Sequence, residues 1–136
     1  MTLPTSAHQV IETLAPMSAW EDRYRQLILW GKALPKMSVE KQCDEALVSG
    51  CEAKVWLYAT REHEQWQFDI DANTRVVRGL IVLVLAAFNQ QTSQQILAFD
   101  VDSYFERIGL LNQLTSSRAN GLNAIVESIQ AKAANT

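Results

Sequence analysis

The chain has 136 residues, of which 48% are hydrophobic and 20% are charged. This composition is ordinary for a single globular domain over residues 1–136, and it excludes a largely disordered chain. Twelve lysines and arginines against fifteen aspartates and glutamates give a net charge of −3, which argues against a general nucleic-acid-binding protein. The most apolar run, residues 79–88, is too short to span a membrane, so we expect no membrane association.

The cysteines and the first residues of the chain suggest a cellular location. Cys43 and Cys51 are too few for the disulfide framework of a small secreted domain, and their spacing matches no common zinc motif. Residues 1–9 lack the basic and apolar segments of a signal peptide. We therefore expect a cytoplasmic protein with free thiols, without a metal site and without a cofactor of its own.

The N-terminal third predicts two helices. Residues 5–15 have apolar side chains at helical spacing and end at Pro16. Ser18 and Glu21 have the spacing of a capping box, in which a hydroxyl and a carboxylate bond the free N–H groups at a helix start. The amphipathic helix that follows ends at Pro35. Its apolar face is formed by Trp20, Tyr24, Leu27, Ile28 and Gly31.

The middle of the chain predicts a small antiparallel sheet. Residues 55–60 are rich in β-forming side chains, and residues 65–70 alternate aromatic or aliphatic with polar side chains. The polar link over residues 61–64 is short enough to join them as a hairpin. Residues 36–49 have no clean period and form a connection, in which residues 46–48 form a short strand that leads toward the hairpin.

Residues 74–90 predict a buried central helix, because the run from Leu80 to Phe88 is apolar almost all round. Strand is the competing interpretation, since valine and isoleucine are frequent there, but the length and the absence of turn residues favour helix. Asp71 or Asn73 would cap this helix.

The last third predicts three more helices. Two short ones cover residues 92–99 and residues 101–108, and Gly109 ends the second. The final helix begins with a serine or threonine cap among residues 115–117. Because the strands and helices do not alternate along the chain, the fold class is α+β, with a small antiparallel sheet packed against several helices. The apolar face of the final helix is formed by Leu122, Ile125, Val126 and Ile129.

Cys51 is the candidate for chemistry. It follows Gly50 and precedes the first strand, so it lies in the loop that enters the sheet. Glycine permits backbone angles closed to other residues, and such a loop can present a sulfur whose thiolate is the reactive form. The pattern alone slightly favours a buried apolar role for Cys51. Cys43 lies among acidic neighbours that disfavour a thiolate, so we expect a structural or incidental thiol.

Arg118 lies in the first turn of the final helix, where a cation opposes the helix dipole. It therefore requires an anionic neighbour, and a surface acid, a buried carboxylate or a thiolate would each serve. His63 lies in the polar turn, at the end of the hairpin opposite Cys51, so we discount a Cys–His pair. The carboxylates around the strands predict a solvated rim: Glu52, Glu62, Glu64, Asp69 and Asp71.

Four segments, in this order and spacing, resemble the SufE-like family of sulfur-acceptor proteins, which includes the CsdE branch. Together they extend the resemblance from about Trp20 to Lys132. They are Trp20-Glu21-Asp22-Arg23-Tyr24 leading to Leu34-Pro35; Ser49-Gly50-Cys51 followed by Val55-Trp56; Val76-Val77-Arg78-Gly79-Leu80; and Leu114-Thr115-Ser116-Ser117-Arg118-Ala119-Asn120-Gly121-Leu122.

The resemblance implies a fold similar to that of the IscU cluster scaffold and a role in sulfur transfer. It implies that Cys51 accepts sulfane sulfur from a pyridoxal-phosphate-dependent cysteine desulfurase, SufS-like or CsdA-like. The protein would stimulate that enzyme and pass sulfur to a downstream acceptor or scaffold, chiefly for iron–sulfur cluster assembly. It would act as the partner of an enzyme rather than as a stand-alone one.

The resemblance also implies roles for individual residues. Gly50 belongs to the acceptor loop, and Arg118 falls in the family's SR-x-x-GL pattern, which implies a position near Cys51 where it stabilises a thiolate or persulfide. Asp71 and Asn73 occupy a connection that lies near the partner surface in this family. We expect the Cys51 loop to be tucked inward in the free protein and turned outward when docked.

Other functions remain open at this stage. A non-catalytic adaptor would activate the desulfurase by contact alone, an IscU-type scaffold would bind a cluster, and a cysteine hydrolase would turn over without a partner. The sequence leaves open the choice between the SufE and CsdE branches, and it is compatible with a monomer or a weak dimer.

Overall fold

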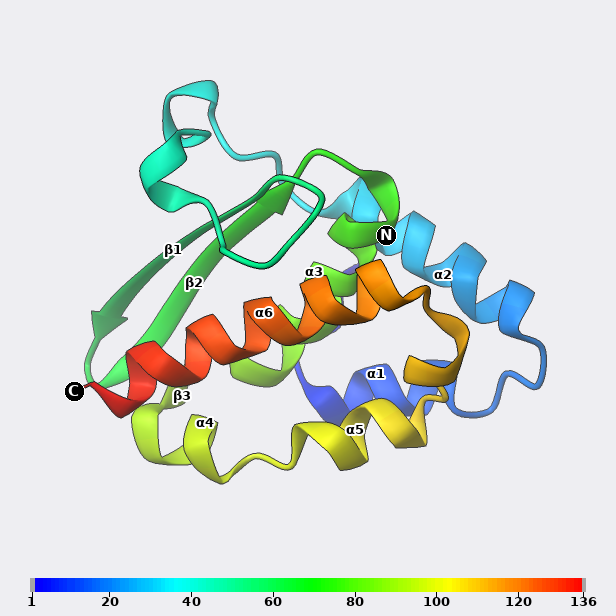
Figure 1. Ribbon diagram of the computed structural model, residues 1–136. Coiled ribbons are helices and arrows are strands. Elements are labelled where there is room, and N and C mark those ends of the chain that lie inside the picture. The colour runs from blue at the N-terminus through cyan, green and yellow to red at the C-terminus, as the bar shows by residue number, and fades with distance from the viewer. Residues whose placement is uncertain (1, 136) are drawn as a thin grey trace.

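The computed structural model describes residues 2–135 and is built from helices that lie to one side of a small sheet (Figure 1). Its elements follow the predicted order, which confirms the α+β class. The helices are α1 (Ala7–Leu14), α2 (Trp20–Ala33), α3 (Arg75–Phe88), α4 (Ser93–Ala98), α5 (Val101–Arg107) and α6 (Ser116–Ala134), and the strands are β1 (Val55–Glu62), β2 (Gln65–Ala72) and β3 (Gln91–Thr92).

The sheet has the order β1-β2-β3, with both pairings antiparallel. Val55 lies opposite Ala72 at one end of the hairpin and Glu62 opposite Gln65 at the other. His63 and Glu64 form the turn with φ angles of 53° and 68°, the left-handed backbone that a two-residue hairpin turn requires. The predicted hairpin is therefore confirmed. The turn is also at the opposite end of β1 from Cys51, as expected for His63.

Two predicted boundaries differ in the structure. Residues 46–48 do not form a strand, because only Leu47 forms a bridge, to Trp56, and residues 44–46 form a single 3₁₀ turn. The central helix ends at Phe88 rather than Gln90, since Gln90 has a positive φ of 62° and the chain then enters the two-residue strand β3. Residues 75–88 are helical, so the strand alternative was wrong.

Helix α3 lies at the centre and packs against α2, α6 and β2 (Figure 1). Its crossing with α2 is close because both helices have a glycine there. A Cβ on Gly31 would lie 2.9 Å from the carbonyl oxygen of Arg75, and a Cβ on Gly79 would collide with the carbonyl group of Leu27. The two backbones are therefore in direct contact, and a larger residue at either glycine would push the helices apart.

The main core lies between α3, the surrounding helices and one face of the hairpin, which contributes Val55, Leu57, Phe68 and Ile70. A second cluster covers the other face of β1. Helix α3 is almost wholly buried but has only 14 residues. Across residues 2–135, no helix is long and apolar enough to cross a membrane. The second cluster consists of Met37, Ala46 and Trp56, with Cys43 and Tyr58 packed against it.

The N-termini of helices α2 and α3 differ from the predictions. Helix α2 has Ala19 at its N-cap and no side-chain cap, so Ser18 and Glu21 do not form a capping box. Glu21 still favours the helix, because an acidic side chain in the first turn complements the dipole. Helix α3 starts after Thr74, and neither Asp71 nor Asn73 caps it. Helix α6 is capped by the hydroxyl of Thr115, as predicted.

Candidate functional site

Cys51 lies in a narrow cavity of about 30 Å³ between its loop, helix α3 and the first half of α6. The loop joins Val48 to the start of β1, so the strand pairing fixes where it ends. Within residues 2–135, no group of three or more histidine, cysteine, aspartate or glutamate side chains is arranged to hold a metal ion. The cavity is lined by Cys51, Glu52, Ala53 and Val55, by Val77 and Leu80, and by Ser117, Arg118, Gly121, Leu122 and Ile125.

Gly50 makes the turn that points Cys51 toward α6. Its φ of 92° is in the region that favours glycine, so any other residue would strain the loop. The loop also runs close to α6, since a Cβ on Gly50 would lie 3.4 Å from the Cβ of Ala124. Both the backbone conformation and the close packing against α6 therefore favour glycine at position 50.

The sulfur of Cys51 is half-buried against α6. Its Sγ donates to the carbonyl oxygen of Gly121 at 3.5 Å, a weak bond that holds the thiol inward. Gly121 has no side chain, and a Cβ there would lie 3.7 Å from the sulfur. Burial raises the pKa of the Cys51 thiol above its ordinary value of 9.0, and no other cause contributes. The inward position therefore favours the unreactive thiol.

Arg118 lines the same cavity from the first turn of α6. Its side chain is exposed and forms no ion pair or hydrogen bond with the part of the chain that the structure describes. It does not lower the pKa of Cys51 in this conformation, since burial is the sole cause of the shift. The structure thus brings Arg118 and Cys51 to one cavity and leaves the guanidinium without an anion.

The structure corrects two interpretations of Asp71, one as a solvated rim residue and the other as a docking candidate. It is 2% exposed and forms an ion pair with Arg78, and its carboxylate accepts hydrogen bonds from the backbone N–H groups of Met37, at 2.9 Å, and Ala72, at 2.7 Å. Arg78 also donates to the carbonyl oxygens of Gly31 and Leu34. Asp71 therefore joins β2 to α3 and to the end of α2, and its side chain is not available to a partner.

Asn73 is exposed and clips the Cys51 loop to the start of α3. Its side-chain oxygen accepts a hydrogen bond from the backbone N–H of Lys54 at 3.2 Å, and its own N–H donates to the carbonyl oxygen of Lys54 at 3.1 Å. This reciprocal pair fixes the C-terminal end of the loop. The other rim carboxylates, Glu52, Glu62, Glu64 and Asp69, are exposed as expected.

Cys43 packs in the second cluster, whereas Cys51 packs against the main core on the other face of the sheet. The sulfur of Cys43 lies 3.3 Å from the hydroxyl oxygen of Tyr58. Both cysteines are free thiols in the structure.

Comparison with known proteins assigns the chain to a family. The model of the SufE family, described as an Fe-S metabolism associated domain, matches residues 8–133. An uncharacterized SufE-like protein of Rhizobium etli is 38% identical over 94% of this chain and 89% of its own length. The sulfur acceptor protein CsdE of Escherichia coli K12 is 39% identical over 91% of this chain and 85% of its own length. The chain belongs to the SufE family.

A solved structure confirms the fold independently. The solution structure of a hypothetical protein from Thermus thermophilus superposes with a TM-score of 0.77, covering 98% of this chain and 97% of that chain, at 17% identity. At this level of identity the likeness concerns the fold alone. The family and fold expected from the sequence are therefore both confirmed.

Two features of the site were not singled out from the sequence. Gly121 was noted only as part of a family pattern, although a glycine inside a helix is costly and usually has a packing reason. Here a Cβ at Gly121 would lie in ordinary van der Waals contact with the sulfur of Cys51, so a side chain larger than alanine is what the site excludes. The Lys54–Asn73 pair has no sequence signal, because it joins residues nineteen positions apart through one amide side chain.

Proposed function

We propose that this protein is a sulfur acceptor that receives sulfane sulfur on Cys51 from the persulfide of a pyridoxal-phosphate-dependent cysteine desulfurase. Membership of the SufE family supports this role, and so does the name of the Escherichia coli relative, a sulfur acceptor protein. The observation that carries it is the position of Cys51, whose sulfur lies half-buried in a cavity between its loop and helices α3 and α6. Such a cavity can shelter a persulfide between two transfers.

The transfer is a thiol–disulfide-type exchange. The Cys51 thiolate attacks the outer sulfur of the partner's persulfide, a new S–S bond forms on Cys51, and the S–S bond on the partner breaks. The partner's cysteine leaves as a thiolate, and the Cys51 proton goes to solvent. A second attack by a downstream acceptor thiolate on the outer sulfur restores the Cys51 thiolate. The pyridoxal phosphate belongs to the desulfurase, and this chain holds no cofactor in the proposal.

The reaction requires Cys51 to leave the position seen in the structure. There the sulfur faces Gly121 and burial raises its pKa, so both access and ionisation are unfavourable. A single weak hydrogen bond holds the sulfur inward, whereas the hydrogen bonds between Asn73 and Lys54 fix the C-terminal end of the loop. The loop therefore turns outward about its fixed C-terminal end when the partner docks.

Arg118 stabilises the sulfur anion during this movement. Its guanidinium lines the same cavity without an ion pair to any residue in 2–135, and it serves as a positioning charge for the thiolate or the persulfide anion as each forms. Asn73, exposed beside the loop, is the docking candidate that we retain. The sulfur then passes to an acceptor, chiefly for iron–sulfur cluster assembly, in keeping with the description of the family.

The test of this function is stimulation of a cysteine desulfurase. With free cysteine and a reductant in excess, sulfide release by the enzyme should rise on addition of the wild-type protein and of Cys43→Ser, and it should not rise with Cys51→Ser. Stimulation retained by Cys51→Ser would show that the protein acts as an adaptor by contact. Turnover of a cysteine substrate without any desulfurase would instead indicate a hydrolase.

A further inference from the structure

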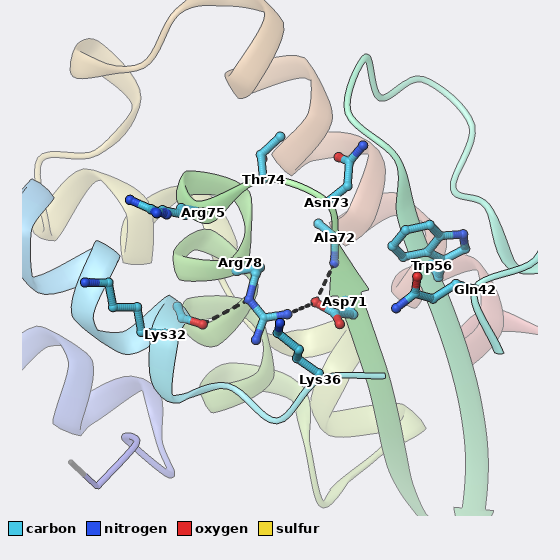
Figure 2. Close-up of a pocket in the computed structure, with 11 residues that line it drawn as sticks. Lys32, Lys36, Gln42, Trp56, Asp71, Ala72, Asn73, Thr74, Arg75 and Arg78 are labelled. Atoms are coloured by element: carbon cyan, nitrogen blue, oxygen red, sulfur yellow. Dashed lines mark hydrogen bonds and ion pairs between the residues drawn. The ribbon is translucent and has the colours of Figure 1, made fainter. Parts of the chain in front are cut away.

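A second, larger pocket lies beside the N-terminus of α3 (Figure 2). Its volume is about 480 Å³, within the range of pockets that hold small organic molecules. Residues from the end of α2, the connection after it, β1, the end of β2 and the start of α3 form its walls. None of these residues lines the Cys51 cavity.

The pocket concentrates positive charge in an acidic protein. Lys32, Lys36 and Arg75 line it with exposed side chains, and within residues 2–135 none of the three side chains has an ion pair or a hydrogen bond. The sole carboxylate in its wall, Asp71, is already bonded by Arg78. Three uncompensated cations therefore share one concavity, although the whole chain has a net charge of −3.

The cations reach the pocket from separate elements. In Figure 2, Lys32 on α2 and Arg75 on α3 lie on one side, and Lys36 extends toward the Arg78–Asp71 pair. Asn73 lies on the opposite side. Like charges repel, so an excess of cations around one concavity favours the binding of an anion there. The tight α2–α3 crossing and the β2–α3 connection place the three residues around this one pocket.

Neutral hydrogen-bond donors add to the positive potential of the pocket. Helix α3 begins at the pocket with neither a side-chain cap nor an acidic residue in its first turn, so its first N–H groups and the positive end of its dipole are uncompensated. The oxygen of the Asn73 amide is occupied by Lys54, which leaves its two N–H donors for another group. Thr74 contributes a hydroxyl to the same wall.

We propose that this pocket is a binding site for a small organic anion that bears at least two carboxylate or phosphate groups. A single-charge ion would leave most of the cations unpaired, whereas a polyanion of small-molecule size can pair with more than one of them and fill a pocket of this volume. The site goes beyond sulfur transfer, because no residue of the Cys51 cavity lines it, although Asn73 in its wall also fixes the end of the Cys51 loop.

The test is an NMR titration of the isotope-labelled protein at constant ionic strength, with citrate, inorganic phosphate and ADP as separate probes. Citrate represents the carboxylate class, and the other two represent phosphate. We expect saturable shifts in the backbone signals of Asn73, Thr74 and Arg75 with at least one of citrate and ADP. The same shifts are expected in Cys51→Ser, which separates this site from the sulfur-transfer function.

Variants locate the site. The triple substitution Lys32→Ala, Lys36→Ala and Arg75→Ala should weaken binding by about tenfold or more, since it removes every unpaired cation. Arg107→Ala, an exposed arginine on α5, is the control and should leave the affinity unchanged. Because the three side chains are exposed, the triple variant should keep its fold, which circular dichroism would verify. Unsaturable shifts with all three probes, or an unchanged affinity in the triple variant, would overturn the proposal.

Discussion

The sulfur of Cys51 lies 3.5 Å from the carbonyl oxygen of Gly121, in the first half of the longest helix. Glycine is the residue that leaves this space open, and a Cβ in its place would be in ordinary contact with the sulfur at 3.7 Å. The Cys51 loop therefore packs against helix α6 through the contact between this sulfur and this carbonyl oxygen. The size of the residue at position 121 should consequently affect how accessible and how reactive the sulfur is.

Replacing Gly121 tests the fit. Gly121→Ala should raise the free energy of unfolding by about 0.5–1 kcal/mol, because alanine favours the helix and its Cβ meets no clash. Gly121→Leu should fill the cavity and displace the sulfur, so iodoacetamide should alkylate Cys51 several-fold faster at constant pH. Asn123→Leu, an exposed position on the same helix, is the control. An unchanged rate in Gly121→Leu would mean that the sulfur is not held against α6 in solution.

The ionisation of Cys51 gives a second prediction. Because burial raises the thiol pKa, the rate of alkylation of Cys51 in a Cys43→Ser background should reach half its maximum above pH 9.0, the ordinary value. In denaturant, the alkylation rate should reach half its maximum near pH 9.0. A midpoint below 9.0 in the folded protein would show that Arg118 already stabilises a thiolate before any partner binds.

The same pKa shift affects stability. The folded protein binds the Cys51 proton more tightly than the unfolded chain, so its contribution is fully present below pH 9.0 and is lost as the pH rises through the folded-state pKa. The stability difference between wild type and Cys51→Ser should therefore fall across that window. Urea titrations at several pH values would measure it, and a difference that grows with pH would contradict the burial of the thiol.

Arg118 should affect transfer without affecting the fold. Arg118→Ala removes an exposed cation from the first turn of α6, where it opposes the helix dipole, so stability should change by less than about 0.5 kcal/mol. The rate of persulfide formation on Cys51 should fall by about tenfold, the effect of losing one hydrogen bond to a charged group. Arg118→Lys should restore part of that rate. Equal rates in all three proteins would leave Arg118 without a role in transfer.

Unlike Arg118, the Asp71–Arg78 pair should affect the stability of the fold. Asp71→Ala leaves a partly buried guanidinium and the N–H of Met37 without their acceptor, so the free energy of unfolding should fall by about 3–5 kcal/mol. Asp69→Ala, two residues away, removes an exposed ion pair with Lys41 and should cost less than about 1 kcal/mol. Denaturant unfolding of the two variants would compare them. Similar losses in both would refute a structural role specific to Asp71.

The order of helices and strands could be predicted because each has its own period in the sequence. The alternation of Trp66, Phe68 and Ile70 identified β2, and the apolar run after Gly79 identified α3. The role of Asp71 could not be predicted in this way. An aspartate near a helix start has the pattern of a cap, and its partners Arg78 and Met37 come together only when α2, β2 and α3 are packed.

The site shows the same division. The place of Gly50 and Cys51 before a strand makes Cys51 a candidate, although the pattern alone favours a buried role for it, and the family resemblance implies that Arg118 lies near Cys51, with which it lines one cavity. The inward position of the sulfur depends on the separation between a loop and a helix seventy residues later, which no local pattern encodes. The unpaired cations around the second pocket are dispersed in sequence for the same reason.

The central claim is that Cys51 carries the sulfur, and intact mass spectrometry tests it most directly. The protein would be incubated with a cysteine desulfurase and free cysteine, then weighed with and without reductant. The account predicts an added mass of one sulfur atom in the wild type and in Cys43→Ser, removed by reductant and absent in Cys51→Ser. Sulfur retained by Cys51→Ser, or no sulfur on the wild type while the desulfurase is still stimulated, would contradict it.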